Sequence, residues 1–409
     1  MPAPAASPHR PNRSTAARIV SAGLVAGLLS SLPAPPSLAA SGPETRLALT
    51  PPMGWNSWNH YHLEITDPLI RAQAAAMATN GMKAAGYEYV VIDGGWEGHH
   101  DAQGIFQTDP NRFPDMKGLC DYIHSLGLKV GIHTTPGPKT CAGHEGSYGH
   151  EAQDAKTFAG WGMDFIKYDW CSGDEVYKPE EMQGAYKKMQ DALAATERPI
   201  LYSLCQYGQQ DVWKWGASVG AQMWRTTGDI ADNYFNMLVI GFGQNGLEKY
   251  AGPGHWNDPD CLEVGNGRMK AEESRTQMTL WCILAAPLFA GNDLTQMSAA
   301  TLAILTNPEA IAVNQDRAGQ QGYRVRQEGP LEVWMKPLAD GSKAVALFSR
   351  HGRTMDLTLN FPDIGISGAA QVRDLWTHKD LGTFKARFTA AIPRHGAVLL
   401  KVRPAQPPH

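Results

Sequence analysis

The stretch FPDMKGLCDYIHSLGLKVGIHTT (residues 113–135) contains two patterns in immediate succession. Its first part places apolar residues at spacings of three and four, which is typical of a helix with one buried face. Its second part, from Leu128 onward, is a short apolar run with Val and Ile, which predicts a buried strand. A helix that leads into a buried strand is the building unit of an α/β fold.

The same unit recurs between about Leu47 and Gln315. Short apolar runs, each followed by a polar loop, predict eight strands at 53–58, 87–93, 128–135, 164–169, 199–205, 221–227, 254–258 and 287–293. Helix-like stretches lie between them, for example at 67–82, 180–196 and 271–286. Eight alternating strands and helices over this length predict a (β/α)8 TIM barrel. The alternative, a doubly wound sheet, lacks its glycine-rich turn after the first strand.

The sequence changes character after about Asp316. Short alternating runs separated by Gly, Asp and Pro occur within 323–350, 355–361, 369–376 and 396–402, and they predict a C-terminal antiparallel β-sandwich domain. The pair Asp340-Gly341 between two such runs is a hairpin signal. The predicted domains are therefore a segment at 1–40, a catalytic barrel at 41–316 and the β-sandwich at 317–409. Because no low-complexity linker separates the last two, we expect them to pack together.

Residues 1–40 predict a cleaved signal peptide. Basic positions from His9 to Arg18 precede the apolar run IVSAGLVAGLLSSL, and small residues follow near Ala40. A membrane anchor is the alternative, but the run is shorter than the roughly 20 residues that span a bilayer. We therefore expect a secreted or periplasmic protein.

The composition narrows the class of partner. Of 409 residues, 43% are hydrophobic and 19% charged, which is ordinary for a globular protein. The 36 basic and 40 acidic residues give a net charge of -4. The sequence therefore lacks the excess of basic residues that would predict binding to nucleic acid or to an anionic membrane. An uncharged, sugar-like substrate fits better.

The six cysteines have no metal-site spacing, and CxxC and HExxH motifs are missing, so we expect no metal and no cofactor. The sequence makes no prediction about oligomeric state.

The C-terminal ends of barrel strands carry the chemistry of this fold, and here they are polar and aromatic. Aromatic faces beside carboxylates suit a sugar, whose C–H face stacks while its hydroxyls bind charged groups. The candidate residues are Trp55, Asn56, Trp58, Asp93, Trp96, His133, Lys167, Asp169, Cys205, Gln206, Tyr207, Arg225, Asp229, Asp258, Asp260, Asn292 and Asp293. For His133 a core position and a substrate contact both stay open, and Asp258 is either a turn residue or a site residue.

Hydrolysis of a glycosidic bond with retention needs one carboxylate as nucleophile and a second carboxyl group as proton donor. Asp169 and Asp229 are the predicted pair. Lys167 lies two residues before Asp169, on the same face of the strand, so its charge can hold the aspartate ionised. Asp229 follows Arg225 in a loop, a position that suits a partly desolvated group that keeps its proton.

Several motifs together resemble glycoside hydrolase family 27, which includes α-galactosidases and α-N-acetylgalactosaminidases. These are PPMGWNSWN (51–59), KTCAG (139–143), GMDFIKYDWC (162–171), YSLCQYG (202–208), WRTTGDI (224–230) and GHWNDPDCLEVGN (254–266). The resemblance implies that Asp169 is the nucleophile and Asp229 the acid/base. It also implies a disulfide between Cys141 and Cys171. The substrate-binding residues that we expect are Trp55 for stacking, Asp93, His133, Lys167, Cys205, Tyr207, Arg225 and Asp260.

Three departures from the family pattern affect the sugar pocket. Gly94 stands where most members have a second aspartate, His133 stands where galactosidases usually have a tyrosine, and Gln206-Tyr207 replace a glutamate and a tryptophan. A lost carboxylate removes a charge-assisted hydrogen bond worth roughly 1.5–3 kcal/mol. We therefore predict a retaining exo-acting glycoside hydrolase, first an α-galactosidase. The alternatives are a β-L-arabinopyranosidase, an isomaltodextranase or an α-N-acetylgalactosaminidase. A non-catalytic carbohydrate-binding protein is a further alternative, which the presence of both carboxylates disfavours.

Overall fold

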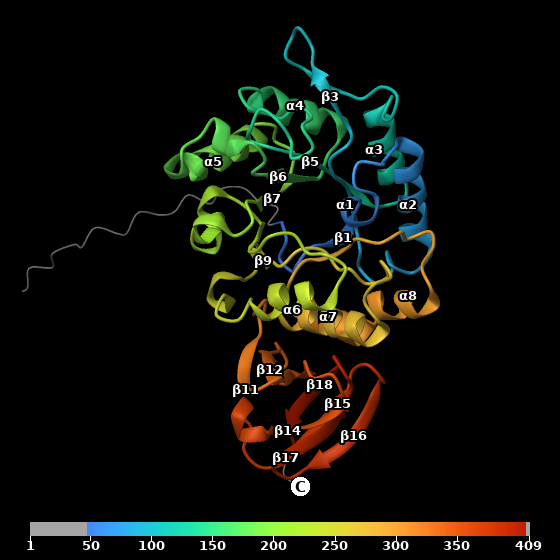
Figure 1. The fold of residues 1–409 in the computed structure, drawn as a ribbon, viewed down its shortest axis with the longest axis vertical. Helices are drawn as coiled ribbons and strands as arrows, with labels where there is room; N and C mark the ends of the chain where they lie inside the picture. The colour runs from blue at the N-terminus through green and yellow to red at the C-terminus, as the bar shows by residue number, and fades with distance from the viewer. Residues whose placement is uncertain (1–46, 406–409) are drawn as a thin grey trace, which may run out of the picture. The chain divides into compact units, whose positions relative to one another are not determined.

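The computed structural model describes residues 47–405 (Figure 1). The predicted signal peptide lies outside these residues. Within the described part of the chain, every helix is too short or too polar to cross a membrane.

Eight parallel strands form the barrel, as predicted (Figure 1). They pair in the order β10-β1-β2-β5-β6-β7-β8-β9. Leu262, just beyond β9, forms a parallel bridge with Ala290 of β10 and so joins the two ends of the sheet. The strands are β1 (Met53–Asn56), β2 (Tyr89–Ile92), β5 (Lys129–Thr134), β6 (Phe165–Asp169), β7 (Leu201–Cys205), β8 (Met223–Arg225), β9 (Trp256–Asp258) and β10 (Leu288–Ala290).

Helices alternate with these strands. The α-helices are α1 (Trp58–Tyr61), α2 (Asp67–Thr79), α3 (Met116–Ser125), α4 (Glu151–Trp161), α5 (Met182–Ala194), α6 (Tyr234–Phe242), α7 (Ala271–Ile283), α8 (Ala299–Leu305) and α9 (Pro308–Asn314). In the stretch 113–135, Asp115 caps α3 by accepting a 2.8 Å hydrogen bond from the Gly118 amide. The helix then buries Met116, Leu119, Cys120 and Ile123, and β5 follows directly.

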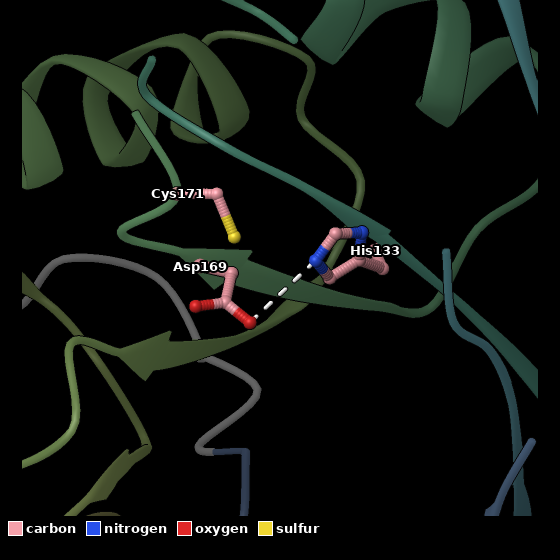
Figure 2. Close-up of side chains that lie close together, drawn as sticks. All are labelled: His133, Asp169 and Cys171. Atoms are coloured by element: carbon pink, nitrogen blue, oxygen red, sulfur yellow. Dashed lines mark ion pairs between the residues drawn. The ribbon is translucent and has the colours of Figure 1, made fainter. Parts of the chain in front are cut away.

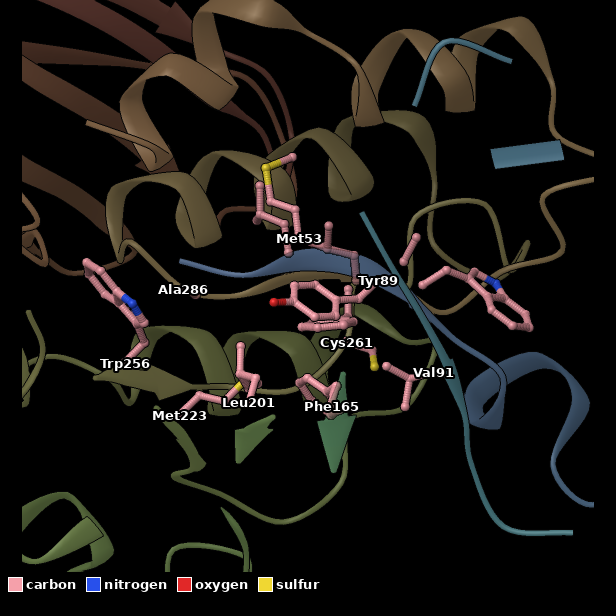
Figure 3. Close-up of a cluster of buried hydrophobic side chains, with 14 of the residues drawn as sticks. Met53, Tyr89, Val91, Phe165, Leu201, Met223, Trp256, Cys261 and Ala286 are labelled. Carbon is pink, nitrogen blue, oxygen red and sulfur yellow. The ribbon is translucent and has the colours of Figure 1, made fainter. Parts of the chain in front are cut away.

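Large side chains fill the interior of the barrel (Figure 3). The rings of Tyr89 and Phe165 lie 5.6 Å apart, and the ring of Phe289 lies 5.5 Å from that of Phe165. Gly131 makes room for them, because a Cβ atom there would lie 2.9 Å from Phe165. Side chains alternate along a strand, so Lys167 and Asp169 point to the same interior side as Phe165. The apolar core therefore gives way to polar side chains at the C-terminal ends of the strands.

A hairpin that the sequence did not predict follows β2. It consists of β3 (Glu97–His100) and β4 (Phe106–Thr108). His100 anchors it to the barrel, with Nδ1 2.6 Å from Glu145 and Nε2 2.9 Å from Asp154. The side chain of Asp154 is fully buried, so this contact fixes the hairpin from within the protein.

The C-terminal domain is an antiparallel β-sandwich. One sheet has six strands in the order β11-β12-β13-β18-β15-β16, and β14 pairs with β17 in a second sheet. The strands are β11 (Tyr323–Glu328), β12 (Leu331–Pro337), β13 (Lys343–Ser349), β14 (Met355–Asn360), β15 (Ala370–Asp374), β16 (Lys379–Phe384), β17 (Arg387–Ile392) and β18 (Ala397–Pro404). The predicted hairpin at Asp340-Gly341 joins β12 to β13. The strands β16 and β17 were not predicted.

Helix α7 contacts both the barrel and the β-sandwich. Its Thr276 donates a 2.7 Å hydrogen bond to the carbonyl of His395, and Glu273 lies 2.7 Å from the imidazole of the same residue. Further along, Thr279 accepts a 2.9 Å hydrogen bond from the indole of Trp376. Nearly every side chain of α7 is therefore buried, including its polar ones.

Candidate active site

A pocket with about 510 Å³ of empty space opens at the C-terminal ends of the barrel strands. Residues from seven of the eight barrel strands or their following loops line it. The lining consists of Asn56, Trp58, Asn59, Asp93, Gly94, His133, Thr140, Cys141, Ala142, Lys167, Asp169, Tyr207, Arg225, Asp229, Asp260 and Cys261. This is the end of the barrel at which the fold places its active sites.

Strand β6 contributes a cation and a carboxylate to one wall. Asp169 is 5% exposed, and its Oδ2 atom lies 3.8 Å from Lys167 Nζ. Burial by itself would raise the pKa of Asp169, but the neighbouring His133, Lys167 and Tyr207 lower it overall. Its Oδ1 atom is buried and has no hydrogen-bond partner among residues 47–405. Asp169 is thus an ionised carboxylate with one free oxygen, as a nucleophile requires.

Strands β1 and β2 hold Asp93 beside this pair. Its Oδ2 atom accepts hydrogen bonds from Asn56 at 2.8 Å and from Lys167 at 2.9 Å. Burial by itself would raise the pKa of Asp93. The charges of Lys167 and His133, with the amide of Asn56, nevertheless hold that pKa well below its ordinary value. Lys167 therefore stands between two carboxylates and cannot move freely.

His133 at the end of β5 faces carboxylates on both sides. Its Nε2 atom lies 3.6 Å from Asp169 Oδ2, and its Nδ1 atom lies 3.5 Å from Oε1 of Glu97. Burial by itself would lower the pKa of His133, but Asp93 and these two carboxylates raise it to about 10. The imidazole is therefore charged at neutral pH, which makes His133 part of the site and not a neutral core residue.

The opposite wall is built around Arg225 of β8. Its Nη2 atom lies 3.0 Å from Asp229 Oδ1 and 2.8 Å from Asp260 Oδ2. Asp260 adopts a φ of 81°, a strained conformation for a non-glycine residue, and also accepts hydrogen bonds from the amides of Ile230 and Cys261. Asp260 therefore positions the guanidinium, while Asp229 reaches into the pocket.

Asp229 is more open than its sequence position suggests. We expected a partly desolvated group, but 59% of its side chain is exposed. In the free protein the carboxylate is accessible to water and to a leaving group. A proton donor at this position would therefore have to be desolvated by the bound substrate.

A disulfide joins Cys141 to Cys171 and closes one rim of the pocket. The hydroxyl of Tyr207 lies 3.4 Å from Cys141 Sγ, and Tyr207 holds a left-handed backbone with φ of 59°. Figure 2 shows Asp169 pointing to His133 with Cys171 nearby. Ligand atoms of these three residues lie within 4.8 Å of one another. Because Cys171 is half of a disulfide, its sulfur is not a thiolate and the group does not fit a metal ion.

The comparisons with known proteins agree with this geometry. Residues 50–316 match the family model described as alpha galactosidase A. The chain belongs to the alpha-galactosidase A family, glycoside hydrolase family 27. Residues 328–402 match the model of the alpha galactosidase C-terminal beta sandwich domain. This family resemblance, which the sequence motifs indicated, is therefore confirmed.

Similar proteins are found in bacteria, plants and fungi. The chain is 44% identical to alpha-galactosidase A of Cellvibrio japonicus, over 93% of this chain and 98% of that protein. It resembles the crystal structure of alpha-galactosidase I from Mortierella vinacea with a TM-score of 0.84, 37% identity and coverage of 88% and 98%. A GH27 β-L-arabinopyranosidase from Geobacillus stearothermophilus matches with a TM-score of 0.76, 28% identity and coverage of 88% and 97%.

The structure places two expected substrate contacts away from the pocket surface. Trp55 is fully buried, its indole donates a 2.7 Å hydrogen bond to the carbonyl of Asn292, and it does not line the pocket. Cys205 is also fully buried, and its sulfur lies 3.7 Å from Arg225 Nη1. The indole on the pocket wall belongs instead to Trp58, which lies three residues later in the same family motif.

Several other residues also line the pocket. Asn56 and Trp58 are candidates from their place at a strand end, but the sequence assigns them no role, whereas Asn59, Thr140, Ala142 and Cys261 carry no sequence signal of their own. Glu97 was missed as well, because it belongs to the unpredicted hairpin. The clue in the sequence would have been an acidic residue that follows shortly after a predicted barrel strand, where site residues gather.

Proposed function

We propose that this protein is a retaining, exo-acting α-galactosidase that releases terminal α-linked galactose through a covalent glycosyl-enzyme intermediate. The observation that carries this proposal is the placement of Asp169 and Asp229 on opposite walls of one pocket. One carboxylate is buried and ionised beside cations, and the other is held by Arg225 and open to solvent. This asymmetry matches the two roles of a retaining glycosidase.

The geometry supports a two-step reaction. Asp169 attacks the anomeric carbon, the bond from that carbon to the leaving oxygen breaks, and Asp229 transfers its proton to that oxygen. Asp229 then removes a proton from a water molecule, which attacks the same carbon and releases Asp169. Asp93 and Lys167 are the groups that we expect to bind the sugar hydroxyls, and Arg225 keeps Asp229 in place.

Chemical rescue with azide can separate the two roles. In an Asp169→Gly variant, azide should enter from the side that the nucleophile occupied and give β-galactosyl azide from an activated aryl α-galactoside. In an Asp229→Gly variant, the glycosyl-enzyme still forms, and azide should attack it to give the α-anomer. An Asp211→Gly variant, changed at an exposed aspartate of the 3-10 helix Gln209–Lys214, should give galactose and no azide adduct. The same anomer from both pocket variants would contradict the assignment.

The sugar specificity has a second candidate. Gly94 leaves space on the pocket wall, since a Cβ atom there would meet nothing closer than 3.6 Å. An arabinopyranose is a galactose ring without its C6 group, and one structural relative is a β-L-arabinopyranosidase. We expect an aryl α-galactoside to be cleaved faster than the β-L-arabinopyranoside, α-N-acetylgalactosaminide and α-glucoside. A higher kcat/KM for the arabinopyranoside would reverse this order.

We also propose that the enzyme is exported. The basic and apolar pattern of residues 1–40 and the disulfide between Cys141 and Cys171 both suit an oxidising compartment. N-terminal sequencing of the mature protein should find a start near residue 40. An intact Met1 on protein recovered from the cytoplasm would contradict export.

A further inference from the structure

The carboxylate of Glu97 is buried behind the pocket wall. Its side chain is fully buried, and its Oε2 atom accepts a 2.6 Å hydrogen bond from the amide of Gly95. Within the part of the chain that the structure describes, the Oε1 atom has no hydrogen-bond partner, and the cation that faces it is His133, at 3.5 Å. Burying a carboxylate without a compensating charge costs free energy, so the charge of Glu97 and the charge of His133 depend on each other.

The imidazole of His133 has a carboxylate at each nitrogen. A neutral imidazole has one N–H and one lone pair, so either tautomer would turn a lone pair toward Glu97 or toward Asp169. Only the imidazolium offers an N–H to both. At 3.5 and 3.6 Å both contacts are ion pairs that are longer than hydrogen bonds, and such contacts tighten when substrate binds.

Gly94 supplies the space that this arrangement uses. A Cβ atom at position 94 would lie 3.7 Å from Glu97 Oε1 and 3.9 Å from His133 Nδ1. An aspartate there would fit sterically, but its carboxylate would stand beside that of Glu97. The carboxylate beside Nδ1 of His133 is therefore that of Glu97, and the residue at position 94 has no side chain.

We propose that Glu97 is a positioning residue for Asp169: its carboxylate keeps both nitrogens of His133 protonated and directs Nε2 toward Asp169, beside the space that Gly94 leaves. This inference rests on the proposed role of Asp169 as nucleophile. Four charged groups face the ring, namely Glu97 from β3, Asp93 after β2, and Lys167 and Asp169 of β6. Removing one of the three carboxylates lowers the pH at which the ring loses its proton.

The variant Glu97→Gln tests the proposal, because it keeps the volume and the hydrogen bond from Gly95 but removes the charge. In protein labelled with 15N-histidine, the resonances of His133, assigned with a His133→Gln variant, should titrate at lower pH than in the wild type. With 2,4-dinitrophenyl α-galactoside, which needs no proton from Asp229, kcat/KM should be nearly unchanged below pH 6. As pH rises, the loss should grow to about 10- to 100-fold.

Two further variants separate positioning from a structural role. Gly94→Asp in the Glu97→Gln background puts a carboxylate back beside Nδ1 and should restore both the titration and the activity at high pH. Glu273→Gln removes a buried carboxylate that faces a different histidine, His395 of the β-sandwich, and should leave both readouts unchanged.

An unchanged His133 titration in the Glu97→Gln variant, or a loss of kcat/KM that is the same at every pH, would overturn the proposal. A wild-type protein that cleaved no α-galactoside would instead refute the proposed function. In that case the NMR titration still decides whether Glu97 controls the ring.

Discussion

Arg225 holds Asp229 by a 3.0 Å contact, although 59% of the Asp229 side chain is exposed and only 3% of the Arg225 side chain is. A buried cation thus orients an open carboxylate. The same guanidinium is fixed by Asp260 at 2.8 Å, so its own position does not depend on substrate.

We expect the Arg225→Lys variant to fold but to lose more activity on substrates with poor leaving groups than on substrates with good ones. A lysine keeps the positive charge but offers a single point contact, so it cannot hold Asp260 and Asp229 together. For aryl galactosides with poor leaving groups, which in the proposed mechanism need a proton from Asp229, kcat should fall by about 10- to 100-fold. With dinitrophenyl galactoside the loss should be much smaller. Equal losses for both substrates would argue against the orienting role of Arg225.

The Tyr207→Phe variant should shift the acidic side of the pH profile. The hydroxyl of Tyr207 is one of the groups that lower the pKa of Asp169. Without it that pKa is higher, so the acidic limb of kcat/KM should move to higher pH. Tyr177→Phe, which removes a hydroxyl that contacts Glu151, is the control and should leave the limb in place.

Two tryptophans of one motif should respond differently to substitution. Trp58 lines the pocket, so Trp58→Ala should raise KM by about tenfold through lost contact with the sugar. Trp55 is buried and bonded to Asn292, so Trp55→Phe should lower the free energy of unfolding by about 1–3 kcal/mol with little change in KM. Urea unfolding and steady-state kinetics on both variants test this, and a raised KM for Trp55→Phe with unchanged stability would restore Trp55 as the stacking residue.

The interface between the barrel and the β-sandwich contains a buried lysine whose charge is costly. Lys336 is fully buried, and its Nζ atom donates one 3.2 Å hydrogen bond to the carbonyl of Asn314. Burial lowers the pKa of Lys336 from 10.5 to about 8. Between pH 8 and 10.5 the unfolded chain therefore holds more protons than the folded one, and stability rises with pH.

Lys336→Met should remove that rise and increase the free energy of unfolding at pH 7 by about 1 kcal/mol. The gain is the relief of a buried charge, reduced by leaving the carbonyl of Asn314 unpaired. Urea unfolding at pH 7 and pH 10 measures both effects. A variant whose stability still rises between these two values would show that another group causes the slope.

All eight barrel strands could be predicted from the sequence, because each is a short apolar run with a polar end. Even β8, β9 and β10, which have three residues each, carry this pattern. The strand β16 could not be found, since its sequence KDLGTF is almost wholly exposed and has no apolar face. The β3–β4 hairpin escaped for a similar reason, because its strands read EGHH and FQT.

The residues of the site also differ in whether a local sequence pattern could predict them. Lys167 and Asp169 share a strand, so the two-residue period alone puts them on one face. The contact between Glu97 and His133 joins a hairpin to a strand that is more than thirty residues away, and no local pattern encodes it. Trp55 shows the converse, since its place at a strand end did not reveal on which side of the backbone its indole lies.

Helix α7 packs against the barrel on one side and against the strands of the β-sandwich on the other. Buried polar residues such as Thr276 and Thr279 use sandwich atoms as their hydrogen-bond partners. The sandwich is therefore not a detachable module. A shortened enzyme that ends after α9 would expose an apolar, hydrogen-bond-deficient surface, and a smaller catalyst made from this chain would need a redesigned α7 before it could remain in solution.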